Sequence, residues 1–493
     1  MKKYNMITDS PGRSLFFFAL PMILGNLFQQ FYSMVDSIIV GQFVGEDALA
    51  AVGASYSLTT VFIMIAIGGG IGASVITSQY LGASLYRKMR TSAYTALLSF
   101  LAVSILLAGI GLIFSRSILV VLNTPDNILE DAMVYLQIYF LGLPFLFMYN
   151  ILSSVFNALG NSRTPLYLLI FSSLLNIVMD LLFVGGFSLG VAGAAAATVL
   201  AQGLSTVISL LILLKTLKSY QQEEISEQVR KEEADFGRGE NQDISKKNIS
   251  EIESEILKKK SVTEHIQEKP RLYDITMLGS MIRVAIPSML QQSIVSIGML
   301  LVQSVVNGFG SSVLAGYTAG TRVESICIVP MIAAGNAVST FTAQNLGAGK
   351  PERVKRGYKA GIKMVSGFAV LICLILTIFH DGIISAFLEQ GSEAAAFQTG
   401  TDYLSFIAFF FVFIGLKAIT DGVLRGSGDV VVFTLANLIN LGIRVTFAFT
   451  MAPVIGVQAV WIAVPIGWAT NYTISFIRYL SGKWSKKKLI KVE

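Results

Sequence analysis

Two stretches of this chain, GIGASVITSQYLGA at residues 70–83 and GNAVSTFTAQNLGA at residues 335–348, are identical at seven of 14 positions when the chain is shifted by 265 residues. With small insertions and deletions the match extends to further pairs, which are Pro21 and Pro287, Leu49 and Leu314, Gly160 and Gly426, and Asn176 and Asn440. Self-similarity of this kind indicates an internal duplication. We therefore expect two halves with the same structure.

The composition places both halves in a lipid bilayer. Of the 493 residues, 53% are hydrophobic and 14% are charged, and the mean hydropathy is +0.66. Soluble proteins carry about a quarter charged residues, so the composition excludes a soluble enzyme, a disordered scaffold and a β-barrel of alternating strands. The net charge of +6 does not indicate nucleic-acid binding, because the basic residues lie mostly at helix ends and termini.

Hydropathy predicts an all-α integral membrane protein with twelve spans, because windows of about 20 apolar residues are long enough to cross a bilayer. Six windows precede a charged stretch, near residues 15–41, 54–79, 92–115, 132–156, 164–186 and 193–215. Six follow it, near residues 282–307, 314–343, 358–380, 402–424, 430–452 and 457–479.

Loop charges give an independent test of the count, since Lys and Arg accumulate in short cytoplasmic loops. One set of helix ends carries Lys2, Lys3, Arg13, Arg87, Lys88, Arg90, Arg163, Lys350, Arg353, Lys355, Arg356, Arg425, Lys483, Lys486, Lys487, Lys488 and Lys491. The other set carries Arg116 alongside several carboxylates. The asymmetry predicts a multi-pass plasma-membrane protein with both termini and the charged linker in the cytoplasm.

Six crossings return the chain to its starting side, so the two halves are parallel repeats. We expect six-helix lobes at residues 1–216 and 276–493, joined by a disordered linker at residues 217–275. Within that linker Ile249, Ile252 and Ile256 could instead form a short helix on the membrane surface. Parallel repeats are typical of secondary transporters, with the substrate bound between them, although a channel could also be duplicated.

Polar residues inside the first six spans are the candidate site, because an ionisable side chain at membrane depth usually faces a cavity. Helical spacing places them in stripes, with Gln29, Tyr32 and Asp36 on the first helix, Asn150 and Asn157 on the fourth, Asn176 and Asp180 on the fifth, and Thr198 and Gln202 on the sixth. If these stripes converge, they form an oxygen-rich pocket for a proton, a sodium ion or an organic cation. The alternative is that the amides and hydroxyls only cross-link helices.

The remaining candidate residues are a proline in the first helix and charged residues in the second half. Pro21 removes a backbone hydrogen bond from the first helix and is either a hinge or a tolerated bend. The second half carries charges of both signs, at Arg322, Glu324, Lys417, Asp421 and Arg444, for which internal ion pairs are expected. Arg444 occupies the place of Asp180 in the repeat, which suggests that the two lobes have diverged.

The first helix, LPMILGNLFQQFYSMVDSIIVGQFVGEDALAAVG, and the later stretch AGYTAGTRVESICIVPMIAAGNAVSTFTAQNLGAGKPERVKRG resemble the multidrug and toxin extrusion (MATE) family, closest to its DinF-like branch. The resemblance implies a V-shaped pair of six-helix bundles that exports organic cations and other amphipathic compounds in exchange for protons or sodium. Asp36, Asn176, Asp180 and Thr198 match the branch's cation-coupling positions, a possible sodium site, and Pro21 matches a proline where bending has been proposed. The seventh helix lacks the glutamate of the NorM-like branch.

The competing functions are a lipid-linked oligosaccharide flippase, which would use Arg322, Lys417 and Arg444 for a pyrophosphate, and a membrane enzyme. An enzyme is disfavoured because the two histidines, His265 and His380, lie in the linker and at a helix end, and no Walker A or HExxH motif is present. Cys327 and Cys373 lack metal-binding spacing. We expect a monomeric antiporter without a cofactor, driven by H⁺ or Na⁺, whose partners are small-molecule drugs and the lipid bilayer.

Overall fold

The computed structural model describes residues 5–44, 46–121, 124–239, 270–388, 394–487 and 489–490. Within these residues the secondary structure is helical, with no strand. The first half contains α1 (Pro11–Phe43), α2 (Glu46–Gly82), α3 (Tyr86–Val121), α4 (Asp126–Ala158), α5 (Arg163–Asp180) with a π-helical extension (Leu181–Gly186), and α6 (Gly190–Gly239). The second contains α8 (Ile275–Asn307), α9 (Ser311–Gly347), α10 (Pro351–Phe387), α11 (Ala394–Ile407), which a 3₁₀ turn (Ala408–Phe410) joins to α12 (Phe411–Ser427), α13 (Val430–Ile455) and α14 (Gln458–Leu480).

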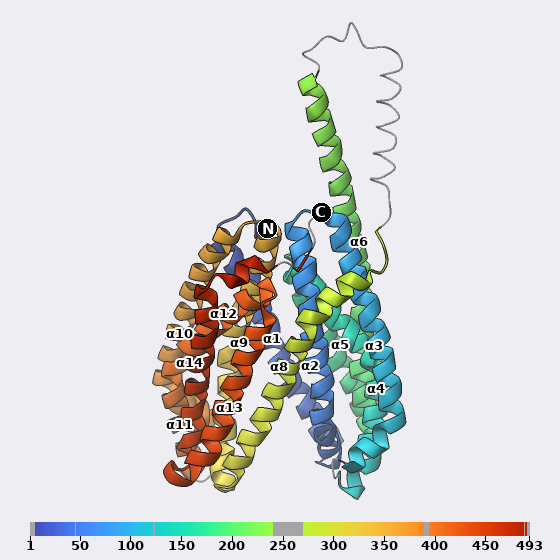
Figure 1. Cartoon of the computed structure of the whole chain (residues 1–493). Helices are drawn as coiled ribbons and strands as arrows, with labels where there is room; N and C mark the ends of the chain where they lie inside the picture. Colours follow the sequence, from blue (N-terminus) through green and yellow to red (C-terminus); the bar gives the residue numbers. More distant parts are fainter. Residues whose placement is uncertain are drawn as a thin grey trace.

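These helices confirm the predicted all-α membrane fold. Eleven of them, with α11 and α12 counted as one, are long and apolar enough to cross a membrane within the described residues. The 33-residue α8 occupies the position of the one remaining predicted span, near residues 282–307. Figure 1 shows the helices gathered in two bundles, with both chain ends on one face, which we call the terminal face. The protein is therefore a multi-pass membrane protein.

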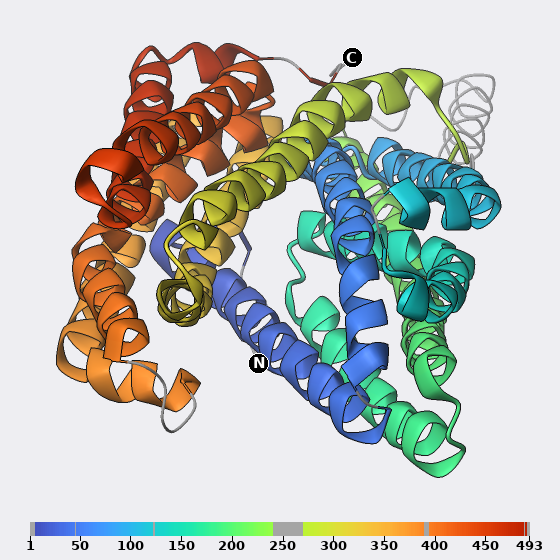
Figure 2. The same ribbon diagram turned by 90° about the horizontal axis from the view of Figure 1, so that it is seen from below.

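The first helix of each half crosses between the bundles, which differs from two self-contained six-helix lobes. At the start of α1, Leu15 and Phe18 pack in the hydrophobic core of α9–α14, whereas near its end Tyr32 contacts α5. At the start of α8, Met277 and Met281 pack in the core formed by α2, α3 and α4. Figure 2 shows both helices running obliquely between the bundles. We use "first lobe" for α2–α6 with the end of α1, and "second lobe" for α9–α14 with the end of α8.

The lobes meet near the terminal face through the duplicated motif itself. The Nε2 of Gln79 donates to the carbonyl oxygen of Gly426 at 3.3 Å, and the Nε2 of Gln344 donates to the carbonyl oxygen of Ala158 at 2.8 Å. Gly82 lies against the backbone of Gln344, and Gly347 lies against the backbone of Gln79, so closely that a Cβ on either glycine would collide with a carbonyl oxygen. We call this contact the glutamine–glycine interface.

The linker differs from its prediction at its start. The helix α6 continues beyond the first lobe to Gly239, into the segment for which disorder was expected. Two contacts with α3 hold its first turns beyond the lobe: Arg90 pairs with Glu224 at 3.0 Å, and the rings of Tyr86 and Tyr220 stack 5.7 Å apart. The possible surface helix at Ile249–Ile256 lies outside the described residues.

Candidate functional site

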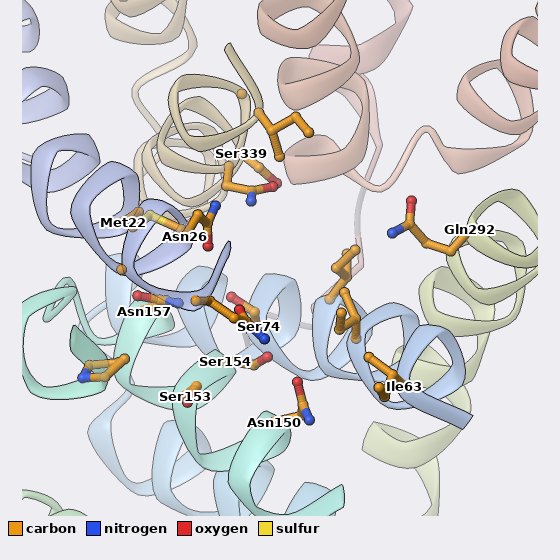
Figure 3. Close-up of a pocket in the computed structure, with 18 of the residues that line it drawn as sticks. Met22, Asn26, Ile63, Ser74, Asn150, Ser153, Ser154, Asn157, Gln292 and Ser339 are labelled. Carbon is orange, nitrogen blue, oxygen red and sulfur yellow. The ribbon is translucent and has the colours of Figure 1, made fainter. Parts of the chain in front are cut away.

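A cavity of about 660 Å³ lies between the lobes and is lined by helices of both. The first lobe contributes polar side chains from α4, among them Asn150, Ser153 and Asn157, which Figure 3 shows around the same space as Asn26 of α1. Gln292 of α8 and Ser339 of α9 face it from the other side (Figure 3). Small-molecule sites in proteins have volumes of about 300–1,000 Å³, so the cavity is large enough for a drug-sized ligand.

A chain of hydrogen bonds joins three helices on the first-lobe wall. The hydroxyl of Tyr32 on α1 donates to Oδ1 of Asn176 on α5 at 2.5 Å. The Nδ2 of Asn176 donates to the hydroxyl of Thr198 on α6 at 3.4 Å, and that hydroxyl donates to the carbonyl of Ala194 at 3.1 Å. The predicted stripes on these helices thus come together, and their oxygens lie where the fifth and sixth helices face the cavity.

Asp180 lies one helical turn beyond Asn176 on α5 and is fully buried, at 0% exposure. It does not line the cavity, although Asn176 one turn earlier does. The side chain of Asp36 is outside the described residues, although its helix α1 is described. The structure thus brings Tyr32, Asn176 and Thr198 together and places Asp180 next to them in the lobe interior.

The other first-lobe candidates also line the cavity: Pro21, Gln29, Asn150, Asn157 and Gln202. The Nδ2 of Asn150 donates to the carbonyl of Leu146 on its own helix at 2.9 Å, so this amide does not cross-link helices. The Oδ1 of Asn157 is buried without a hydrogen-bond partner in the described part of the chain. These amides retain hydrogen-bonding capacity for a ligand.

On the second-lobe wall, one of the expected ion pairs is present. The Nζ of Lys417 lies 3.0 Å from Oδ2 of Asp421, one turn along α12. Glu324 instead accepts a hydrogen bond from the hydroxyl of Tyr403 at 2.5 Å. Arg322 is exposed, forms no ion pair with any described residue and does not line the cavity, whereas Glu324 does. Arg444 lines the cavity.

The structure adds Arg425 to this wall. The prediction assigned it to a cytoplasmic helix end, but it lies on α12 and lines the cavity. Its Nη2 donates to Oδ1 of Asn336 at 2.7 Å, and its Nε donates to the hydroxyl of Ser339 at 3.4 Å. The signal in the sequence was the four-residue spacing of Lys417, Asp421 and Arg425, which places all three on one helix face.

The described residues contain no group of three or more His, Cys, Asp or Glu side chains that could hold a metal ion. Cys327 and Cys373 are free thiols in half-buried positions. Oxygen atoms from Tyr32, Asn176 and Thr198 are the donors the first-lobe wall offers to a hard cation such as sodium, which prefers oxygen ligands.

Comparison with known proteins agrees with this architecture. The MatE family model matches residues 21–182 and 287–450, one segment in each repeat. The chain is 29% identical over 492 residues to the probable multidrug resistance protein YpnP of Bacillus subtilis, with 99% of both chains covered. It is 27% identical over 490 residues to the probable multidrug resistance protein YoeA of the same organism, covering 98% of this chain and 96% of YoeA.

Two solved structures share this fold. The structure described as the outward-facing conformation of a multidrug resistance MATE family transporter superposes with a TM-score of 0.81 at 20% sequence identity, covering 99% of both chains. A crystal structure of MATE in the straight conformation superposes equally well, with a TM-score of 0.81 at 20% identity and 99% coverage of both chains. Since the family model matches both repeats of a two-lobed membrane protein with a central cavity, the chain belongs to the MATE family of membrane transporters.

Proposed function

We propose that this transporter exports cationic or amphipathic small molecules, multidrug efflux substrates among them, in exchange for protons or sodium ions. The observation that carries the proposal is the 660 Å³ cavity, whose walls come from both lobes. A site between two repeats can be opened to either side of the membrane by rocking the lobes around it. The names of the relatives YpnP and YoeA support multidrug compounds as the cargo.

The cation-coupling site of the proposal is in the first lobe, at Asp36, Asn176, Asp180 and Thr198. Asp180 is buried beside the hydrogen-bonded chain of Tyr32, Asn176 and Thr198, so a proton or sodium ion taken up there would change the polar contacts between α1, α5 and α6. Since α1 also packs against the second lobe, such a change would reach the contact between the lobes. Pro21 lies on α1 between these two regions and lines the cavity, which supports a role as hinge.

We infer that the terminal face is cytoplasmic, because the basic loop residues gather there and the positive-inside rule then holds. The glutamine–glycine interface joins the lobes on this face. The structure would then be a state in which cytoplasmic access to the cavity is closed.

The test is transport of the cationic dye ethidium by the full chain in proteoliposomes, under proton and sodium gradients imposed separately. One of the two gradients should drive dye transport, and Asp36→Asn and Asp180→Asn should each abolish it. Asp126→Asn, a matched change at an exposed carboxylate of the first lobe, should transport like wild type. Transport that neither gradient drives, or that survives both first-lobe substitutions, would refute the proposed coupling.

A further inference from the structure

The C-terminal tail crosses from the second lobe to the first on the terminal face (Figure 1). Its described part follows α14 and consists of residues 481–487 and 489–490. Trp484, in a 3₁₀ turn (Lys483–Lys486), is buried in the core of the second lobe. Ile490, six positions later, is buried in the core that α2, α3 and α4 form in the first lobe. A short length of chain therefore joins the cores of both lobes.

The start of the tail is fixed to the second lobe. The side chain of Trp484 is 1% exposed, its ring stacks on Tyr479 with the centroids 5.7 Å apart, and its Nε1 donates to the carbonyl oxygen of Tyr479 at 2.9 Å. The Nζ of Lys487 lies 3.6 Å from Oδ1 of Asp429, a buried carboxylate oxygen that also accepts from Nη2 of Arg478 at 3.1 Å. Since these partners belong to the second lobe, the tail up to Lys487 moves with that lobe.

The next described residue, Leu489, lies over the seam between the lobes. It sits against Gly428, so closely that a Cβ on this glycine would collide with its side chain. Gly428 follows by two positions Gly426, the acceptor of one hydrogen bond of the glutamine–glycine interface. Leu489 also packs against a small apolar cluster that contains Val75 of α2 and Ala343 of α9, one residue from each lobe. The seam that the two glutamines cross is therefore also covered by an apolar side chain of the tail.

We propose that this tail is a strap that holds the terminal face closed and leaves the first lobe when that face opens. The proposal rests on the proposed function in one respect, that the terminal face opens during transport. Three residues of extended chain reach at most about 10 Å, so Ile490 cannot stay in the first-lobe core while Lys487 moves far away with the second lobe. Opening then exposes Leu489 and Ile490 to water, which is unfavourable in proportion to their apolar area. The strap thus adds to the stability of the closed state.

The test measures the ratio of closed to open molecules for the full chain in nanodiscs. Double electron–electron resonance between spin labels at the exposed residues Ser84 and Lys350, in a chain without Cys327 and Cys373, reports this ratio. Ile490→Ser should lower the ratio about tenfold or more, because the burial of a whole aliphatic side chain is lost. Ile490→Val removes a single methylene, folds like wild type and should lower the ratio about fourfold.

The matched control is Leu480→Ser, the removal of an exposed aliphatic side chain at the end of α14, which should leave the ratio unchanged. Thermal unfolding of each variant separates a strap from ordinary packing. If Ile490→Ser and Ile490→Val lowered the melting temperature but left the ratio at its wild-type value, the tail would only pack on the lobes and the strap would be overturned. An equal fall of the ratio in the control would overturn it as well. The ratio is measured without substrate or ion gradient, so a failure of ion-coupled transport would not affect this result.

Discussion

The two repeats are alike where the lobes touch and unlike where they face the cavity. At the terminal face, Gln79 and Gln344 make equivalent hydrogen bonds across the interface, and Gly82 and Gly347 make equivalent close contacts. On the helices that form the cavity walls, Asn176 is followed one turn later by the buried Asp180, which does not line the cavity, whereas the equivalent Asn440 is followed by Arg444, which does.

The difference follows from what each region must do. Each lobe's motif packs against the other's, so a change in one motif alone would spoil the fit of both. The cavity walls do not pack on each other, so they can diverge. Among the described residues, the first-lobe wall carries amides and hydroxyls, while the second-lobe wall also carries charged side chains. If this view is right, equivalent residues of the glutamine–glycine interface should contribute similarly to closure of the terminal face, whereas the two cavity walls should respond differently to substitution.

The largest effect is expected from filling the glutamine–glycine interface. Gly82→Val and Gly347→Val each place side-chain atoms where a carbonyl oxygen of the opposite lobe lies, so neither variant can close the terminal face. We expect transport to fall at least about tenfold in both. Spin labels at the exposed residues Ser84 and Lys350, in a chain without Cys327 and Cys373, should report a larger separation between the lobes.

Gly109→Val is the control for that experiment, because Gly109 is also helical and a Cβ there meets nothing within 4 Å. It should transport normally and leave the spin-label distance unchanged. If Gly82→Val transported like the control Gly109→Val while Gly347→Val did not, the two glycine contacts would be equivalent in geometry but not in their effect on closure.

The second-largest effect is expected from breaking the ion pair between Lys417 and Asp421 on the second-lobe wall. Lys417→Met leaves Asp421 buried without its cation, a change that costs about 3–5 kcal/mol at buried pairs. The variant should unfold at a clearly lower temperature in detergent, and Lys417→Met/Asp421→Leu should recover part of the loss. If the single variant were as stable as wild type, the ion pair between Lys417 and Asp421 would contribute little to the stability of the second lobe.

The third effect tests the two hydrogen bonds between the lobes. Gln79→Ala and Gln344→Ala should each weaken the closed state by about 1 kcal/mol, as the loss of one hydrogen bond does. Gln344 should have the larger effect, because its bond is 2.8 Å long against 3.3 Å for Gln79. Spin-label distances give the population of the closed state in each variant. A strongly unequal loss in the two variants would show that the two hydrogen bonds are not equivalent.

Much of this fold follows from the sequence, because a bilayer demands long apolar helices. The predicted window 430–452 corresponds to α13 at Val430–Ile455, and the window 314–343 to α9 at Ser311–Gly347. Hydropathy gives the length of a span and not its neighbours, so the crossing of α1 and α8 between lobes was not predicted. The continuation of α6 was missed because charged residues can extend a helix in water when contacts such as Arg90–Glu224 hold it.

The sequence predicted those parts of the candidate site that depend only on the spacing of residues along a helix. Helical periodicity placed Tyr32, Asn176 and Thr198 on faces that meet in the structure. A spacing of two residues already predicts that Arg322 and Glu324 lie on different faces of one helix, but periodicity does not say which face meets the cavity. In the structure Glu324 lines the cavity and Arg322 is exposed. Arg425 was assigned to a loop because it lies near a helix end, and only the packing of α12 on α9 turns it into the cavity.

The smallest effect is expected at the start of α8, one of the two helices that cross between the lobes. Asp274 caps α8, since its Oδ1 accepts from the backbone N–H of Thr276 at 2.8 Å and of Met277 at 3.1 Å, and its own N–H donates to Thr95 of the first lobe at 3.0 Å. The side-chain hydrogen bond from Thr276 and these backbone bonds hold the pKa of Asp274 below its usual value. Its stabilisation is therefore complete at neutral pH and is lost as the pH falls through the lowered pKa.

Asp274→Ala should cost about 0.5–1 kcal/mol at pH 7 and less at pH 3, whereas Asp274→Asn should keep an acceptor and lose only the pH dependence. Thermal unfolding at both pH values measures this, and a cost that grew on acidification would show that another group anchors α8.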